Sequence, residues 1–186
     1  MDQRDLVKRA QQGDRDAFAV LAGAAVARLD GAARLILRDG ELARDAVQDA
    51  MVRAWRDLPG LRDPDRFDAW LRRLTVNACL DVARRRQRRS IEVELTPILM
   101  PSVDDESAGI AEREQLEAAL RRLDPEWRAI VVQHFFLGMP LTEIAVAMGI
   151  PVGTVKSRLH RSLVAMRTTL ADDPEATEPV PGGQFA

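Results

Sequence analysis

The feature that most constrains the fold is a pair of helical patterns separated by a three-residue turn. In residues 141–148 and 152–168, apolar residues recur at spacings of three and four, the period of an amphipathic α-helix. The run Gly149-Ile150-Pro151 between them interrupts the pattern, because glycine and proline break helices. Two such segments joined by a short turn predict a helix-turn-helix.

The second of these helices has an apolar stripe and an opposite face rich in hydrogen-bond donors. The stripe predicted to be buried is Val155, Leu159, Leu163 and Met166. The candidate DNA-contacting residues, on the outer face, on its shoulders or near the helix start, are Thr154, Lys156, Ser157, His160 and Arg161. A solvated face is the other interpretation, and the preceding helix and turn favour DNA reading. Arg158 lies nearer the core edge, where a phosphate contact or a structural role is expected.

The rest of the chain also has helical periodicity. An apolar stripe runs through residues 41–58, and a new helix is expected from Phe67 after the break at 59–66. Asp14 and Asp124 are candidate N-caps, and Pro125 suits a first helical position. The prediction is an all-α fold of two small helical domains, residues 1–90 and 112–171. A flexible acidic linker, 91–111, joins them, and a disordered tail, 172–186, follows.

The net charge of −2 hides an uneven distribution of charge. Residues 1–90 carry 19 basic and 14 acidic side chains, and residues 112–171 carry 8 and 6. The linker carries 0 and 5, and the tail carries 0 and 4. Two basic bodies are therefore compatible with a nucleic-acid partner.

Cysteine content and hydropathy indicate the setting of the chain. Cys79 is the only cysteine, so neither an intramolecular disulfide nor a cysteine-based zinc site is expected. The N-terminus lacks a signal-peptide pattern, and no stretch approaches the roughly 18 apolar residues of a membrane span. A cytoplasmic location without membrane insertion is expected.

Two distant segments resemble the sigma factors of bacterial RNA polymerase, specifically the extracytoplasmic-function (ECF) group of the sigma-70 class. DAVQDAMVRAW and FDAWLRRLTVNACLDVARRR are similar to sigma region 2, and LTEIAVAMGIPVGTVKSRLHRSL is similar to region 4. The resemblance implies a promoter-specificity subunit that performs no catalysis and needs no cofactor or metal. Region 2 would bind the polymerase clamp and open the −10 element, whereas region 4 would bind the flap and the −35 element.

The resemblance also assigns roles to residues of region 2. The implied polymerase-binding residues are Asp45, Gln48, Asp49 and Arg53. Asn77 takes the position of a base-contacting asparagine, and the loop 59–66 with the start of the next helix would hold an unstacked base. The implied phosphate track is Arg84, Arg85, Arg86, Arg88 and Arg89. A solvated helix face remains the alternative for the charged residues in both sets.

The linker suggests a further role within this resemblance. Its acidic residues could occupy the polymerase's basic RNA exit path, so replacing Asp104, Asp105 and Glu106 by serine should weaken the holoenzyme or alter promoter escape. Many members of the group are held inactive by an anti-sigma factor, which makes such a protein a candidate partner.

Two other function classes compete with the sigma-factor hypothesis. A free-standing helix-turn-helix regulator would dimerise and bind a palindrome without polymerase. An enzyme is disfavoured because the sequence has no phosphate loop, metal cluster or nucleophile constellation. The aromatic residues, Cys79 and His134 are expected to pack rather than to react; the aromatics concerned are Trp55, Phe67 and Trp70.

Overall fold

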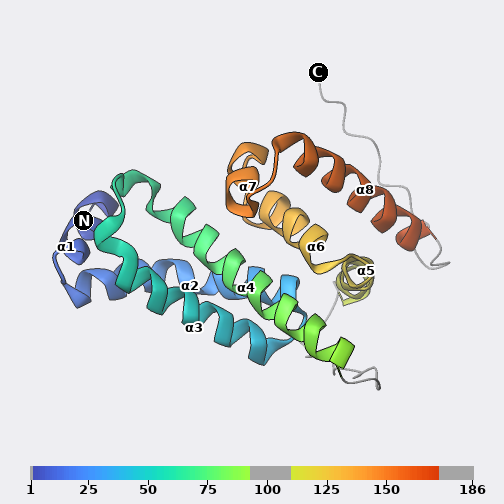
Figure 1. The fold of residues 1–186 in the computed structure, drawn as a ribbon, viewed down its shortest axis with the longest axis horizontal. Helices are drawn as coiled ribbons and strands as arrows, with labels where there is room; N and C mark the ends of the chain where they lie inside the picture. Colours follow the sequence, from blue (N-terminus) through green and yellow to red (C-terminus); the bar gives the residue numbers. More distant parts are fainter. Residues whose placement is uncertain (1, 93–109, 172–186) are drawn as a thin grey trace.

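The computed structural model describes residues 2–92 and 110–171, and every regular element within those ranges is helical (Figure 1). The first unit contains α1 (Gln3–Gln11), α2 (Arg15–Leu37), α3 (Gly40–Asp57) and α4 (Phe67–Glu92). The short 3₁₀ turns η1 (Leu58–Gly60) and η2 (Pro64–Arg66) connect α3 to α4. The second unit contains α5 (Ile110–Arg121), α6 (Pro125–Val131), the π-helical turn η3 (Val132–Phe136), α7 (Leu141–Met148) and α8 (Val152–Ala171). The predicted all-α fold is confirmed.

Both predicted N-caps form. The Asp14 carboxylate accepts a hydrogen bond from the Ala17 amide at 3.0 Å, and this bond is the main reason that the pKa of Asp14 is lowered. The Asp124 carboxylate accepts from the Glu126 amide at 2.9 Å. Each cap satisfies a backbone donor that has no partner within its helix, so the positions of these helix starts follow from local sequence.

The helix-turn-helix forms where the glycine-proline turn predicts it. Gly149 ends α7 with φ of +67°, a left-handed conformation that glycine adopts without steric cost. The Ile150 amide then donates to the Ala145 carbonyl at 3.1 Å, which closes the turn before α8 begins. Along α8 the fully buried positions are Val155, Leu159, Ser162 and Met166.

Leu163 is predicted to be buried, but in the structure it is only half-buried. The buried position next to it belongs to Ser162. The Ser162 hydroxyl donates to the Arg158 carbonyl at 2.8 Å, so it is satisfied within its own helix.

The two units pack against one another. One core lies within the first unit and includes Phe67 and Leu71, with Phe18 and Trp70 packed beside it. A second core runs across both units, from Ile36 in α2 to Ile130 and Ile144 in the second unit. Figure 1 shows α4 running between the rest of the first unit and α6 and α7. The DNA-contact candidates of the two units therefore sit on a single packed body.

The aromatic, cysteine and histidine side chains lie in packed positions. Phe67 is buried, and half-buried Trp55 and Trp70 lie within 5.1 and 6.0 Å, centroid to centroid, of Phe18 and Phe67 respectively. Cys79 is fully buried within the shared core. His134 Nδ1 lies 3.1 Å from the Met139 carbonyl, and the ring meets Phe135 edge-on.

Residues 91–92 belong to α4 and residues 110–111 belong to α5, so the predicted linker bounds of 91–111 overlap two helix ends. The acidic residues Asp104, Asp105 and Glu106 and the tail 172–186 lie outside the described residues. Within the described parts of the chain, no helix combines the length and the apolar character needed to cross a membrane.

Candidate nucleic-acid interface

The predicted DNA-reading side chains of α8 share its exposed side. Lys156, Ser157, His160 and Arg161 are exposed, and Thr154 is half-buried near the helix start. Lys156 and Arg161 form no ion pair with any residue that the structure describes. Because the opposite side of the helix is buried, the second unit presents these donors to solvent on a rigid element.

Arg158 is positioned differently from these donors. It is half-buried, and its Nη1 donates to Glu126 Oε2 at 3.0 Å, which joins α8 to α6. This contact agrees with the structural role expected for a residue at the core edge.

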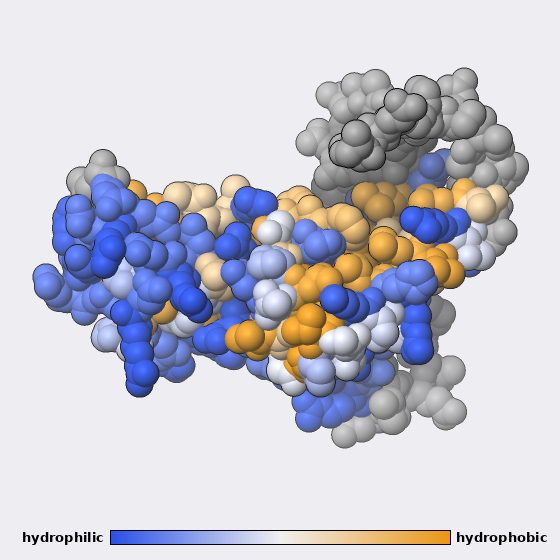
Figure 2. Space-filling view, turned by 90° about the horizontal axis from the view of Figure 1, so that it is seen from above, coloured by the Kyte–Doolittle hydropathy of each residue, from blue (hydrophilic) through white to orange (hydrophobic). Residues whose placement is uncertain are grey.

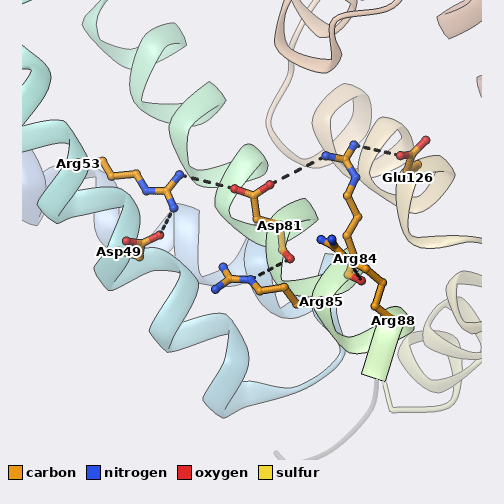
Figure 3. Close-up of polar contacts among 7 residues, drawn as sticks. All are labelled: Asp49, Arg53, Asp81, Arg84, Arg85, Arg88 and Glu126. Atoms are coloured by element: carbon orange, nitrogen blue, oxygen red, sulfur yellow. Dashed lines mark hydrogen bonds and ion pairs between the residues drawn. The ribbon is translucent and has the colours of Figure 1, made fainter. Parts of the chain in front are cut away.

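The predicted arginine track lies along the last described turns of α4. Arg84, Arg85, Arg86 and Arg88 are all exposed. Arg85 and Arg88 donate back to carbonyls of their own helix, at 3.2 and 3.4 Å, as Figure 3 shows. Arg84 pairs with Glu126 of the second unit at 3.1 Å, and Arg86 lies 3.7 Å from Asp39. A phosphate would therefore compete with carboxylates for these last two arginines.

Asn77 lies in the middle of α4 and is half-buried. It follows Arg66, the last residue of the 59–66 loop, by 11 residues, which is roughly 16 Å along a helix axis. Asn77 thus lies about three helical turns beyond the loop 59–66 along the chain.

The predicted polymerase-binding residues follow one side of α3. Asp45 and Gln48 are exposed, whereas Asp49 and Arg53 are half-buried. Arg53 pairs with Asp49 at 2.7 Å and reaches Asp81 of α4 at 3.6 Å (Figure 3). Arg53 thus helps to join α3 to α4, and Asp45 and Gln48 are the freely presented members of this set.

Sequence reasoning missed two residues of α6 that face the first unit. Glu126 accepts from both Arg84 and Arg158, and its pKa is lowered chiefly by the Arg84 hydrogen bond, with burial opposing the shift. Arg128 is 6% exposed and donates to the carbonyls of Ile36 and Leu123, each at 2.8 Å. Burial lowers the pKa of Arg128 to about 10. The only local sign of these buried contacts in the sequence is that Glu126 and Arg128 are charged residues beside apolar neighbours.

The described residues outside these surfaces line a cavity and form no metal cluster. Among residues 2–92 and 110–171, no three His, Cys, Asp or Glu side chains are grouped as metal ligands. A cavity of about 300 Å³ lies between α1, α2 and α4, with Leu137 of the second unit on its wall, and its lining is mostly apolar. Figure 2 shows apolar residues gathered over the middle of the molecule and hydrophilic residues over the end that holds α1.

Comparison with known proteins agrees with this layout. The family described as Sigma-70 region 2 matches residues 23–89, and Sigma-70, region 4 matches residues 113–166. The RNA polymerase sigma-E factor of Streptomyces avermitilis is 36% identical over 138 residues, covering 74% of this chain and 76% of the relative. The ECF RNA polymerase sigma factor SigM of Mycobacterium tuberculosis is 38% identical over 152 residues, covering 81% and 75%.

Two solved structures share the fold. CnrH, solved in complex with the cytosolic domain of CnrY, is 28% identical with a TM-score of 0.68, and the match covers 92% of this chain and 98% of CnrH. The sigma factor RpoE of Bartonella quintana, solved with the anti-sigma factor NepR, has a TM-score of 0.66 at 21% identity, covering 83% and 99%.

The two family matches fall on the two units in the order that the sigma reading requires, and a free-standing regulator has no use for region 2. The chain therefore belongs to the ECF group of sigma-70 factors, the promoter-specificity subunits that bind bacterial core RNA polymerase and direct it to start transcription.

Proposed function

We propose that three surfaces divide the work of this sigma factor. The α3 side that carries Asp45, Gln48, Asp49 and Arg53 binds core polymerase. Asn77 and the arginine track of α4 bind the −10 element, and the exposed side of α8 reads the −35 element. In this proposal residues 1–90 and 112–171 act as separate DNA-binding units.

The observation that carries the proposal is the two-sided character of α8. Four donor-bearing side chains are exposed on a helix whose other side is anchored by buried Val155, Leu159 and Met166. Donors held on a rigid helix after a tight turn suit the major groove, where lysine and arginine pair with guanine edges.

The remaining parts of the proposal follow from the family. The chain performs no catalysis of its own and acts in the cytoplasm, where polymerase and promoter meet. An anti-sigma factor is a proposed partner, supported by the two solved relatives, one described with an anti-sigma factor and the other with the cytosolic domain of CnrY.

The test of the −35 and −10 assignment is run-off transcription on fragmented genomic DNA, with core polymerase alone and with core polymerase plus this protein. New, discrete start sites that share two upstream motifs are the expected result. The motifs then supply the templates for testing α8 and α4 variants. The absence of new start sites, together with palindrome binding by the protein alone, would contradict the assignment.

The polymerase surface needs its own variant, because Arg53 and Asp49 also hold α3 against its neighbours. Asp45→Ala combined with Gln48→Ala should weaken co-purification with core polymerase and leave the helix content unchanged. Asp5→Ala combined with Gln12→Ala removes the same two residue types from exposed positions at α1 and is the matched control. If both double variants retain polymerase equally, this side of α3 is not the polymerase-binding surface.

A further inference from the structure

One carboxylate connects the two proposed DNA-binding units. Glu126 of α6 accepts a hydrogen bond from Arg84 Nη2 of α4 at 3.1 Å and from Arg158 Nη1 of α8 at 3.0 Å. Arg84 belongs to the proposed phosphate track, and Arg158 belongs to the helix proposed to read the −35 element. The Glu126 side chain thus binds one arginine from each of the two proposed DNA-binding helices, α4 and α8.

This carboxylate belongs to a longer row of alternating charges. Figure 3 shows Asp49, Arg53, Asp81 and Arg84 in succession, ending at Glu126. The 3.9 Å contact between Asp81 and Arg84 is the longest in the row. Exposed pairs of this kind contribute little alone and more when they form a network.

Other contacts across the boundary indicate that the units meet at a specific interface. Arg28 of α2 donates to the Phe136 carbonyl at 3.0 Å, and Arg72 of α4 approaches the Leu137 carbonyl at 3.5 Å. In the opposite direction, buried Arg128 donates to the Ile36 carbonyl near the end of α2. Each unit therefore supplies arginines to carbonyls at a helix end of the other.

The closed arrangement does not fit a sigma factor bound along a promoter. Two guanidinium groups that bond to the two oxygens of one carboxylate lie within roughly 8 Å of each other. Centred on positions −35 and −10, the two elements lie about 25 base pairs apart, which is roughly 85 Å of straight B-DNA at 3.4 Å per base pair. Binding both elements requires the two units to separate and the Arg84–Glu126 contact to break.

We propose that Glu126 is a clasp that helps to hold the free protein closed by pairing with Arg84 across the unit boundary, and that it opens before both promoter elements are bound. The proposal rests on the assignment of the two units to the two promoter elements. Within the clasp, the Arg84 arm joins the units, whereas the Arg158 arm lies within the second unit. Loss of either partner in the Arg84 arm should favour the open form, and loss of Arg158 alone should not.

The test measures the distance between the units in the full chain, without DNA or polymerase. Cysteines placed at Val52 of α3 and Val164 of α8, which are 60% and 48% exposed, carry a pair of spin or fluorescent labels. Native Cys79 is buried and stays unlabelled.

Glu126→Gln and Arg84→Gln should each raise the ratio of open to closed molecules by roughly two- to fivefold at low salt. Rising salt should increase the open fraction of the unsubstituted chain. It should also reduce the difference in open fraction between that chain and the two variants.

Two matched variants separate the clasp from a general effect of charge. Arg158→Gln removes the other arginine and breaks only the contact within the second unit. Glu143→Gln removes an exposed carboxylate that forms no ion pair with any described residue. Both should keep the distance distribution of the unsubstituted chain.

Three results would overturn the clasp: an open distribution in the unsubstituted chain, no shift in Glu126→Gln and Arg84→Gln, or an equal shift in all four variants. Because this measurement uses neither promoter nor polymerase, its failure leaves the run-off assignment of the promoter elements standing. Failure of the run-off experiment would instead remove the promoter assignment and leave the measured clasp.

Discussion

The ring of Phe136 lies directly against the backbone of Gly31. A Cβ atom added to Gly31 would lie 2.9 Å from Cζ of Phe136 and 3.4 Å from its Cε1. Phe136 is 40% exposed, and its ring lies over α2 at the edge of the second unit. The absence of a side chain at residue 31 thus lets η3 approach α2, beside the Arg28 contact to the Phe136 carbonyl.

We expect Gly31→Leu to force the Phe136 ring off α2 and to raise the open fraction in the label-distance measurement. Gly23→Leu is the control, because it replaces a glycine in the same helix where nothing lies within 4 Å of the added Cβ. Both changes should improve helix propensity by up to about 1 kcal/mol. If the two variants give the same distance distribution, the Gly31–Phe136 contact does not help to hold the units together.

Lys156→Ala and Arg161→Ala should each reduce −35-dependent initiation by about 1 to 3 kcal/mol, provided that each side chain makes a bidentate base contact. The measurement is run-off transcription on the promoter found with the unsubstituted protein, compared with a template in which the −35 element is scrambled. Arg167→Ala removes the same charge from an exposed position 11 residues beyond Lys156, roughly 16 Å farther along α8. If Arg167→Ala reduces initiation as much as Lys156→Ala does, the loss reflects a general effect of charge.

Asn77→Ala should impair recognition and melting of the −10 element while it leaves −35 binding intact. An amide can donate and accept at the same base edge, and alanine can do neither. Permanganate reactivity of promoter thymines reports melting directly, and a promoter with a premelted −10 element tests whether base recognition is lost as well. Unchanged reactivity on the duplex promoter would count against the assignment of Asn77.

The Cys79 thiol should resist modification in the folded protein. Burial raises its pKa to about 12, and the thiolate is the reactive form. At pH 8, a thiol reagent should therefore react at the rate of unfolding, and reaction should become immediate in denaturant. Rapid reaction in native buffer would show that α4 opens locally around this residue.

The helices and the outward side of α8 were predictable because the features that specify them are local. Asp14 and Asp124 cap the helices that directly follow them, and Gly149 ends α7 at the expected turn. The apolar spacing in α8 also orients Lys156 and Arg161 outward. Such signals lie within a few residues, so periodicity and capping suffice to read them.

The contacts between the units were not predictable in the same way. Glu126 meets Arg84 across 42 positions of sequence and Arg158 across 32, and Arg128 meets Ile36 across 92. A periodic pattern cannot name such partners, and a charged residue in a helix is usually exposed. The burial of Arg128 follows only from the packing of α6 against the end of α2.

The closed form should be sensitive to acid through Glu126. The Arg84 hydrogen bond is the main reason that the pKa of the Glu126 carboxyl lies below its ordinary value of 4.5, and separating the units removes this bond while the Arg158 bond within the second unit remains. A group whose pKa is lower in the closed form than in the open form stabilises the closed form above its open-form pKa. This stabilisation is lost as the pH falls through the lowered value. The label distance should therefore stay constant from pH 8 down to about pH 5 and lengthen below about pH 4.5.

Helix content, followed by circular dichroism, distinguishes opening of the two units from unfolding of the chain. Glu126→Gln should give the same distance distribution across this range, so a low-pH transition of equal size in that variant would assign it to other carboxyl groups.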